Sequence, residues 1–210
     1  MGSCVDPADT IHIVDDDDAI RDSLRVLLEA AGFHVRTHAD PAEFLGAAPG
    51  CSGCVLTDLR MPGMDGLELQ QRLAERRIDL PVIVMTGQGD IPLAVRAMKA
   101  GAVDFLEKPF GDEALLDAVR RAVAESHRRQ DRDAAAGRAR KRLAALTPRE
   151  REVLDLLAAG LSTKAIGQRL GASPRTIEVH RARVFEKLDA ESLPDLVRLV
   201  LTADPGAAGG

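Results

Sequence analysis

Aromatic side chains are nearly missing from this sequence. They make up 2% of the 210 residues, and tryptophan and tyrosine do not occur at all. Because 45% of the residues are nevertheless hydrophobic, the chain can bury real cores, and these must be built from Leu, Val, Ile and Ala. Cysteine is scarce too: three cysteines are a small, odd number, which argues against a fold held together by a disulfide framework.

Long apolar runs are also lacking. No run approaches the roughly 20 residues that a membrane-spanning helix requires, and no signal-peptide hydrophobic region follows Met1. The N-terminal MGSCVD begins like an acylation motif, but Asp6 stands where that motif has Ser or Thr. We therefore expect a soluble, cytoplasmic chain without a membrane partner.

Charge is distributed unevenly along the chain. Residues 1–125 carry 12 Lys and Arg against 22 Asp and Glu, whereas residues 126–210 carry 16 against 11. An acidic half followed by a basic half predicts two domains, and the basic half is the candidate for a polyanionic partner.

The first half alternates strand patterns with helix patterns. The expected strands are 11–14, 33–37, 54–57, 81–86 and 103–108. The expected helices are 19–32, 41–48, 66–76, 91–101 and 112–125. Five repeats of a strand followed by a helix predict an α/β fold, with a five-stranded parallel sheet covered by helices on both faces.

The second half reads differently. Residues 126–143 are charged and rich in alanine, which predicts a solvated linker that is largely helical, with Gly137 as its weak point. From Leu146 onward the pattern is entirely helical, and Thr147 with Glu150 forms a capping box. Three further helices are expected at 162–171, 173–188 and 193–202, and Ser162, Ser173 and Ser192 are their expected N-caps. The short GAS turn between helix 162–171 and helix 173–188 is typical of a helix-turn-helix in a small all-α domain.

Polar groups stand at the carboxyl ends of four of the five expected strands. Asp15 and Asp16 come after the first, Asp58 comes after the third, and Thr86 and Lys108 end the fourth and the fifth. Ligands of parallel α/β sheets bind at these carboxyl ends. Three converging carboxylates repel one another, and Mg²⁺, which prefers oxygen ligands, together with the Lys108 ammonium would neutralise them. A carboxylate in such a setting is equipped to attack a phosphoryl group.

These stretches resemble the receiver domain of response regulators. The resemblance rests on IVDDDDAI, VLTDLRMPGMDG, VMTGQGD and MKAGAVDFLEKPF. It implies a flavodoxin-like strand order, with Asp58 as the phosphoacceptor. It also implies that Asp15 and Asp16 hold Mg²⁺, Asp16 more directly, and that the backbone carbonyl of Arg60 is a further ligand.

The same resemblance assigns a switch. Thr86 would supply a hydroxyl that closes on the phosphoryl group, Lys108 a counter-charge, and Phe105 a rotating aromatic ring. The Lys108–Pro109 bond would be cis. The two remaining aspartates of the acidic run, Asp17 and Asp18, are expected in the first turn of the next helix, where they complement the helix dipole.

The cysteine pair Cys51 and Cys54 allows a different hypothesis. A C-x-x-C pair is found in redox and zinc sites, but zinc requires four ligands and the sequence has no second pair. Cys54 opens a buried strand and Cys51 lies in a loop, which favours structural roles for both. The five histidines do not have metal-ligand spacing.

The third helix of the basic half has two faces. An apolar stripe is expected to be buried: Ile177, Val184 and Leu188, together with Val153, Leu157, Ile166 and Leu170. The outer face is expected to reach base edges in the major groove through Thr176, Glu178, Val179, Arg181, Ala182 and Arg183. Phosphate contacts are expected from Ser162, Thr163, Lys164, Arg175 and Lys187.

The segment from Leu146 to Leu188 resembles the LuxR/NarL-type DNA-binding module. With the receiver, the whole chain is similar to the FixJ subgroup, although Glu178 stands where relatives often carry Lys. The expected domains are a receiver at 8–125, a linker at 126–143 and a helix-turn-helix domain at 144–204.

We therefore interpret the chain as a two-component transcription regulator and not as an enzyme. Its expected partners are a sensor histidine kinase, double-stranded DNA, a second copy of the chain after phosphorylation, and RNA polymerase. Two alternatives remain open at this point: an aspartyl-phosphate hydrolase with a docking domain, and a thiol sensor that uses Cys51 and Cys54.

Overall fold

The computed structural model describes residues 10–87 and 91–204. The N-terminal stretch with Asp6, and residues 8 and 9 of the expected receiver, lie outside the described residues. The chain divides into two compact units, Met1–Arg129 and Gln130–Gly210. The division falls inside the stretch expected to be a linker. Each unit is described by itself below.

The first unit is built on a five-stranded sheet, as predicted. Its strands are β1 (Thr10–Val14), β2 (His34–His38), β3 (Cys54–Asp58), β4 (Val82–Thr86) and β5 (Asp104–Glu107). They lie in the order β2-β1-β3-β4-β5, and every neighbouring pair is parallel. The flavodoxin-like order is therefore confirmed. It brings the carboxyl ends of β1, β3, β4 and β5 to one edge, where the expected site residues lie.

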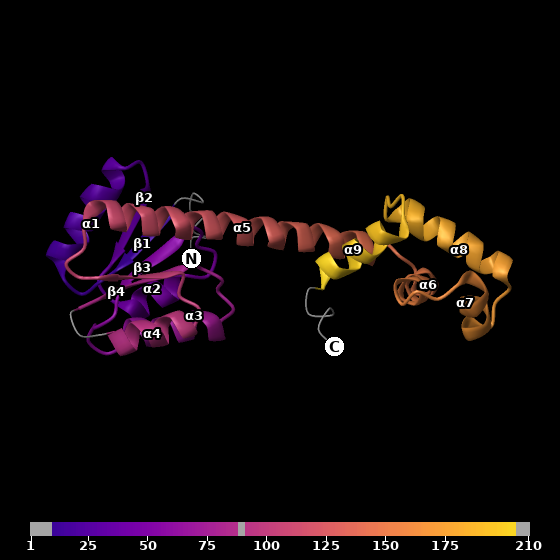
Figure 1. Cartoon of the computed structure of the whole chain (residues 1–210), viewed down its shortest axis with the longest axis horizontal. Helices are drawn as coiled ribbons and strands as arrows, with labels where there is room; N and C mark the ends of the chain where they lie inside the picture. The colour runs from indigo at the N-terminus through magenta and orange to yellow at the C-terminus, as the bar shows by residue number, and fades with distance from the viewer. Residues whose placement is uncertain (1–9, 88–90, 205–210) are drawn as a thin grey trace. The chain divides into compact units, whose positions relative to one another are not determined.

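Helices cover both faces of this sheet (Figure 1). Helices α1 (Asp18–Ala30) and α5 (Asp112–Ala144) lie on one side, and α2 (Pro41–Ala47), α3 (Gly66–Glu75) and α4 (Ile91–Lys99) lie on the other. Alternate residues of the central strands supply the two cores. Val55 and Val84 pack with α2, α3 and α4, whereas Leu56 and Met85 pack with α1 and α5. Phe44 is the one aromatic side chain among the largest fully buried ones of the described residues.

Helix α5 is longer than the sequence predicts. It runs without interruption from Asp112 to Ala144 and passes through Gly137. The expectation of a solvated linker is wrong at its C-terminal end, because Ala139 and Leu143 are buried in a core of the second unit. These two residues are four positions apart and so share one face of the helix. The charged residues between them hide this apolar face in the sequence.

The second unit adds four helices, α6 (Pro148–Ala158), α7 (Thr163–Leu170), α8 (Pro174–Lys187) and α9 (Leu193–Ala203). Their N-terminal caps are those predicted: Thr147 with Glu150 in a capping box, Ser162, Ser173 and Ser192. Gly171 ends α7 in the left-handed conformation at a φ of 62°, which glycine adopts without strain.

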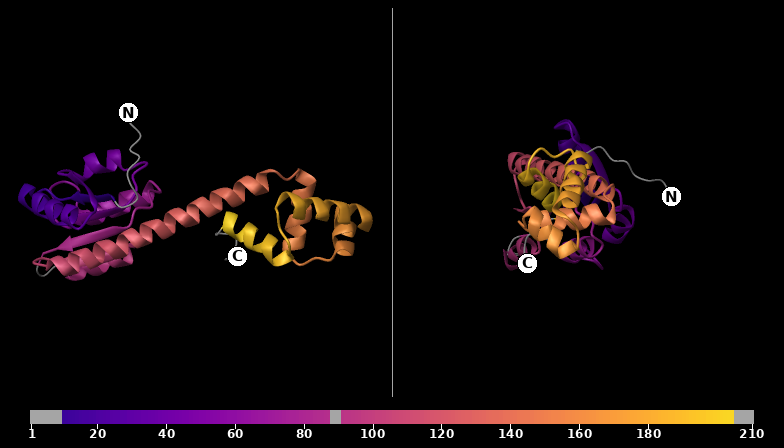
Figure 2. Two further views of the ribbon diagram at one scale, coloured as in Figure 1. Left: turned by 90° about the horizontal axis from the view of Figure 1, so that it is seen from above. Right: turned by 90° about the vertical axis from the view of Figure 1, so that its right-hand side faces the viewer.

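Two small apolar clusters hold these helices together. One joins Val153, Leu157 and Ile166 to Ile177 near the start of α8. The other joins Val184 and Leu188 at the end of α8 to Leu154, Leu196 and the last turns of α5, beside which α9 lies (Figure 2). The predicted apolar stripe of α8 is therefore confirmed, and it is divided between two clusters. Helix α8 is therefore held at both ends.

Within residues 10–87 and 91–204, no helix is both long enough and apolar enough to cross a bilayer.

Gly66 offers a test of how tightly the loop after β3 is packed. A Cβ atom at Gly66 would lie 2.4 Å from the backbone oxygen of Asp58, so Gly66→Ala must displace the chain around Asp58. We expect this variant to lose about 1–3 kcal/mol in free energy of unfolding. The control is Gly46→Ala in α2, where an added Cβ has no neighbour within 4 Å. It should gain about 0.5–1 kcal/mol, because alanine favours helix. Equal effects in denaturant titrations would contradict this account.

Candidate functional site

The centre of the candidate site is an ammonium group held between two carboxylates. Lys108 Nζ lies 2.5 Å from Asp58 Oδ1 and 3.1 Å from Asp15 Oδ2. Lys108 follows β5, Asp58 ends β3 and Asp15 follows β1, so three separate strand ends supply the group. The side chains of Asp15 and Asp58 are 2% and 13% exposed, which limits screening of their charges by water. The sequence predicted this convergence.

Burial and charge act against each other at this position. Burial raises the pKa of Asp15, and the bonds from the Asp17 amide and Lys108 only partly offset that effect. Burial also acts to lower the pKa of Lys108, but its hydrogen bond to Asp58 and the charges of Asp58 and Asp15 outweigh burial and raise it. Lys108 is therefore firmly cationic, and one ammonium faces two carboxylates. The pair of carboxylates has capacity for a further positive charge.

Backbone groups fix both carboxylates in place. The Asp17 amide donates to Asp15 Oδ1 at 2.9 Å, and the Arg60 amide donates to Asp58 Oδ2 at 2.6 Å. Arg21, on α1, donates to the backbone oxygen of Asp15 at 2.6 Å, and its side chain is only 12% exposed. Arg21 is a positioning residue that the sequence analysis missed. Its signal there was only an arginine in the first turn of the helix after the acidic run.

The acidic run divides by role. Asp16 is exposed, and its carboxylate is not gathered with Asp15 and Asp58: among residues 10–87 and 91–204, no three His, Cys, Asp or Glu side chains form a metal-binding group. Asp17 is the N-cap of α1, with Oδ1 accepting from the Ala19 and Ile20 amides, and Asp18 is its first residue. The prediction of a first-turn role is confirmed for Asp18 and moves to the cap for Asp17.

The switch residues occupy distinct environments. Thr86 is buried, and its hydroxyl donates to the Leu106 carbonyl of β5 at 3.5 Å. Phe105 is 43% exposed on the neighbouring strand. The Lys108–Pro109 bond is cis, as predicted.

The two cysteines have the properties of structural residues. Cys54 is fully buried in β3, and burial raises the pKa of its thiol to about 12, so it is almost entirely protonated at neutral pH. Cys51 is half-buried, and its thiol contacts the Ala47 carbonyl at 3.2 Å. Cys54 also packs in the apolar core on the α1 and α5 side of the sheet, where a thiol is inert toward redox chemistry.

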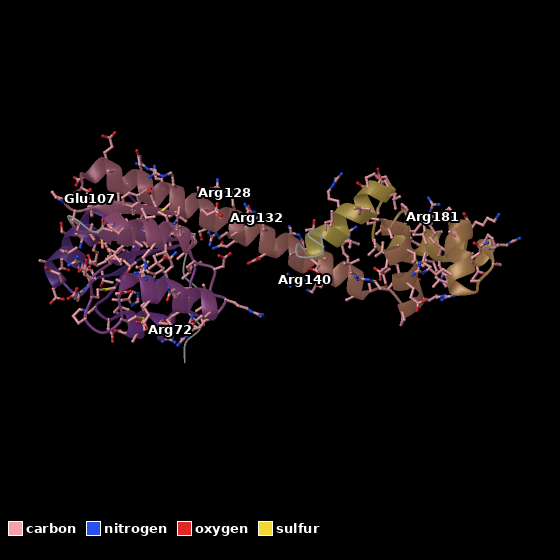
Figure 3. All side chains as sticks on the ribbon, turned by 60° about the horizontal axis from the view of Figure 1, so that its bottom comes forward. Arg72, Glu107, Arg128, Arg132, Arg140 and Arg181 are labelled. Atoms are coloured by element: carbon pink, nitrogen blue, oxygen red, sulfur yellow. The ribbon has the colours of Figure 1, made fainter. Side chains whose placement is uncertain are left out.

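The second unit presents a polar face on α8. All six residues expected to reach base edges are exposed, and Val179 is 48% exposed although apolar. Arg181 lies over the ring of Phe185, with 5.6 Å between its guanidinium carbon and the ring centroid, and Figure 3 shows its side chain on α8. Ser162, Lys164 and Arg175 are also exposed at the starts of α7 and α8.

Lys187 is placed differently from the other expected phosphate contacts. Its ammonium lies 2.7 Å from Oε2 of Glu150, a carboxylate whose side chain is 3% exposed. The hydrogen bond from Lys187, followed by that from the Thr147 amide, lowers the pKa of Glu150 to about 2. The sequence revealed Glu150 only as a capping residue and gave no sign of its second partner.

Comparisons with known proteins identify both units. A model of the response regulator receiver domain matches residues 11–120, and a model of the bacterial regulatory proteins of the LuxR family matches residues 144–200. The transcriptional regulatory protein FixJ of Azorhizobium caulinodans is 52% identical over 194 residues, which are 92% of each chain. The chain belongs to the FixJ-type response regulators. FixJ of Bradyrhizobium diazoefficiens is 50% identical, with 92% of this chain and 95% of that protein covered.

Solved structures agree with the assignment to the FixJ type. The response regulator StyR superposes with a TM-score of 0.77 at 42% identity, covering 91% of this chain and 97% of that chain. Full-length FixJ from B. japonicum gives a TM-score of 0.58 at 49% identity, covering 92% and 96%.

Membership of the FixJ type establishes the general role. The chain is a two-component transcriptional response regulator and not an enzyme, which removes the hydrolase alternative. Its receiver implies a sensor kinase as partner, and its LuxR-type domain implies DNA binding. Receiver domains generally bind Mg²⁺ at the phosphorylation site. The all-oxygen donor set here, with a buried carboxylate pair that one ammonium only partly neutralises, fits such a hard cation.

Asp15 and Asp16 provide a matched test of the metal site. Because burial opposes the ionised form of Asp15, Asp15→Asn should raise the thermal midpoint of the metal-free first unit by several degrees. Asp16→Asn should leave that midpoint unchanged, since Asp16 is exposed. Both variants should shrink the rise in midpoint that MgCl₂ gives the wild type. A full Mg²⁺-dependent rise in both variants would exclude these residues as ligands.

Glu150 predicts a pH dependence for the second unit. Its pKa is about 2 in the folded chain against an ordinary 4.5, so its contribution to stability is complete above about pH 4.5 and is lost as the pH falls toward 2. Thermal midpoints of Glu150→Gln should therefore fall less steeply with acid than those of the wild type over that range. Glu152→Gln on the exposed side of α6 is the control and should follow the wild-type slope.

Proposed function

We propose that a sensor histidine kinase phosphorylates Asp58, and that the phosphorylated chain pairs with a second copy and binds DNA to regulate transcription. This proposal rests on the position of Lys108 Nζ, which lies 2.5 Å from Asp58 Oδ1 and 3.1 Å from Asp15 Oδ2. In this proposal, residues 8–125 form the receiver, residues 126–143 the linker and residues 144–204 the DNA-binding domain.

The proposed transfer uses the geometry around Asp58. A carboxylate oxygen of Asp58 forms the new P–O bond while the bond from phosphorus to the kinase histidine nitrogen breaks, and that nitrogen keeps the electron pair. Mg²⁺ held by Asp15, Asp16, Asp58 and the Arg60 carbonyl would neutralise charge on the phosphoryl oxygens. Binding requires Asp16 to join the other two carboxylates. Lys108 then supplies a donor to the phosphoryl group that replaces its present bond to Asp58 Oδ1.

The proposed switch connects this site to β5. The Thr86 hydroxyl, which now bonds to the Leu106 carbonyl, would turn to the phosphoryl group, and Phe105 would move inward from its exposed position. A bias of about 3 kcal/mol between the two states is sufficient for a roughly hundredfold change in their populations.

Exposed apolar residues support a pairing surface on α4 and β5. Val95 and Met98, three positions apart and so on one face of α4, are 48% and 40% exposed, and Phe105 of β5 is 43% exposed. An ion pair between Arg121 of α5 and Asp104 of β5 lies beside them. Paired receivers would bring two DNA-binding domains to half-sites about 10 base pairs apart. RNA polymerase is the further partner through which a bound dimer would act on transcription.

Asp58→Asn tests the proposal directly. With MgCl₂ and a small phosphodonor such as acetyl phosphate, the wild type should gain one phosphoryl group in intact mass and double its mass by light scattering. Asp58→Asn should do neither, because an amide oxygen is a far weaker nucleophile than a carboxylate. Asp22→Asn, an exposed carboxylate on α1, is the control and should behave as the wild type. Phosphate uptake by Asp58→Asn would show that Asp58 is not the nucleophile.

A further inference from the structure

We propose that Lys187 positions the recognition helix α8 through Glu150 and does not contact the DNA backbone. This inference depends on DNA binding by the LuxR-type domain and is independent of phosphorylation at Asp58. It replaces the expectation from the sequence, in which a lysine at the end of a recognition helix reads as a phosphate contact.

The contacts of Lys187 are directed into the protein. Its Nζ donates to Glu150 Oε2 at 2.7 Å and to the Ala145 carbonyl at 3.4 Å. Glu150 Oε2 also accepts from the Thr147 amide at 2.8 Å, and Thr147 Oγ1 accepts from the Glu150 amide at 3.3 Å. We call this group, Ala145, Thr147, Glu150 and Lys187, the junction. It joins the last residue of α8 to the first turn of α6 and to the segment that follows α5.

Burial makes the junction hard to break. The Glu150 side chain is 3% exposed, so its charge requires a partner in place, and Lys187 is the cation that it has. A phosphate contact would draw the ammonium away and leave that carboxylate with the Thr147 amide alone. The Lys187 side chain is 36% exposed, and Lys164 and Arg175 are also exposed, so exposure does not distinguish them. What distinguishes Lys187 is the buried carboxylate opposite its ammonium, whereas Lys164 and Arg175 lie at helix starts, where DNA-binding helices contact phosphates.

The junction affects base recognition because a small tilt of α8 at Lys187 displaces the other end of the helix. The residues expected at base edges begin at Thr176, at the opposite end of the 14-residue helix from Lys187. A helix of that length is about 20 Å long, so a tilt of about 5° at its C-terminal end moves the reading end by about 2 Å. Apolar packing at Ile177 and Val184 limits such a tilt, and the ionic junction fixes the remaining end.

The experiment uses the full chain and a fluorescent duplex that the wild type selects from a random-sequence pool. Dissociation constants are measured by anisotropy over a series of salt concentrations, for the selected duplex and for a scrambled one. A lysine that neutralises one phosphate contributes about 0.9 to the slope of log K against log salt. Its loss weakens binding equally on all sequences, whereas a lost positioning residue weakens the selected duplex more.

For Lys187→Met we expect at least a tenfold loss of affinity for the selected duplex, an unchanged salt slope and a smaller ratio between selected and scrambled duplexes. Lys164→Met and Arg175→Met are the matched controls, and each should lower the slope by about 0.9 while preserving that ratio. Lys187→Arg should restore most of the ratio, because a guanidinium can also pair with Glu150.

The double variant Glu150→Gln/Lys187→Met keeps the test decisive if the single variant folds poorly, because it removes the unpaired buried carboxylate. If Lys187 acts through Glu150, the double variant binds the selected duplex better than Lys187→Met alone. The proposal is overturned if Lys187→Met lowers the salt slope by about 0.9 with the sequence ratio preserved, or if the two substitutions weaken binding additively.

Discussion

The receiver depends on one electrostatic constraint: two carboxylates meet at the end of a parallel sheet and a single ammonium lies between them. The sheet creates this constraint, because parallel strands deliver their ends to one edge whatever residues they carry. Burial then strengthens the interaction between these charges, because charges removed from water interact at a lower effective dielectric constant. Backbone amides of Asp17 and Arg60 hold the two carboxylates, and the Arg21 guanidinium holds the main chain at Asp15 through its carbonyl. A site of this kind is ready for added positive charge.

The DNA-binding unit solves a different problem, which is to hold a surface helix firmly with little apolar material. Two small, mainly aliphatic clusters hold the two ends of α8, and Phe185 packs against one of them. Hydrogen-bonded caps complete the arrangement, each built from a serine or threonine at a helix start. The capping box at Thr147 serves both purposes, because its glutamate also receives Lys187 from the recognition helix.

Most of the receiver could be predicted from sequence because its signals are local and repeated. Alternating strand and helix patterns fix the sheet, and strand-end polar residues such as Asp58 and Lys108 follow from it. What escaped prediction depends on three-dimensional neighbours. Asp16 follows the same strand as Asp15 but is exposed, since adjacent residues point in different directions. Lys187 reads as a solvent-facing cation, and only the fold shows the buried carboxylate opposite it. Leu143 was hidden among charged residues, whose spacing around a helix leaves one apolar face.

The continuation of α5 to Ala144 has a consequence for where the DNA-binding unit begins. Ala139 and Leu143 cover Leu196 and Ala203 of α9, and Arg140 donates to the Ala203 carbonyl at 3.2 Å. A truncated fragment starting at residue 144, where the match to the LuxR family begins, would lack this cover and leave one side of α9 bare. The last turns of α5, which carry Arg140 (Figure 3), therefore belong to the second unit as its fifth helix.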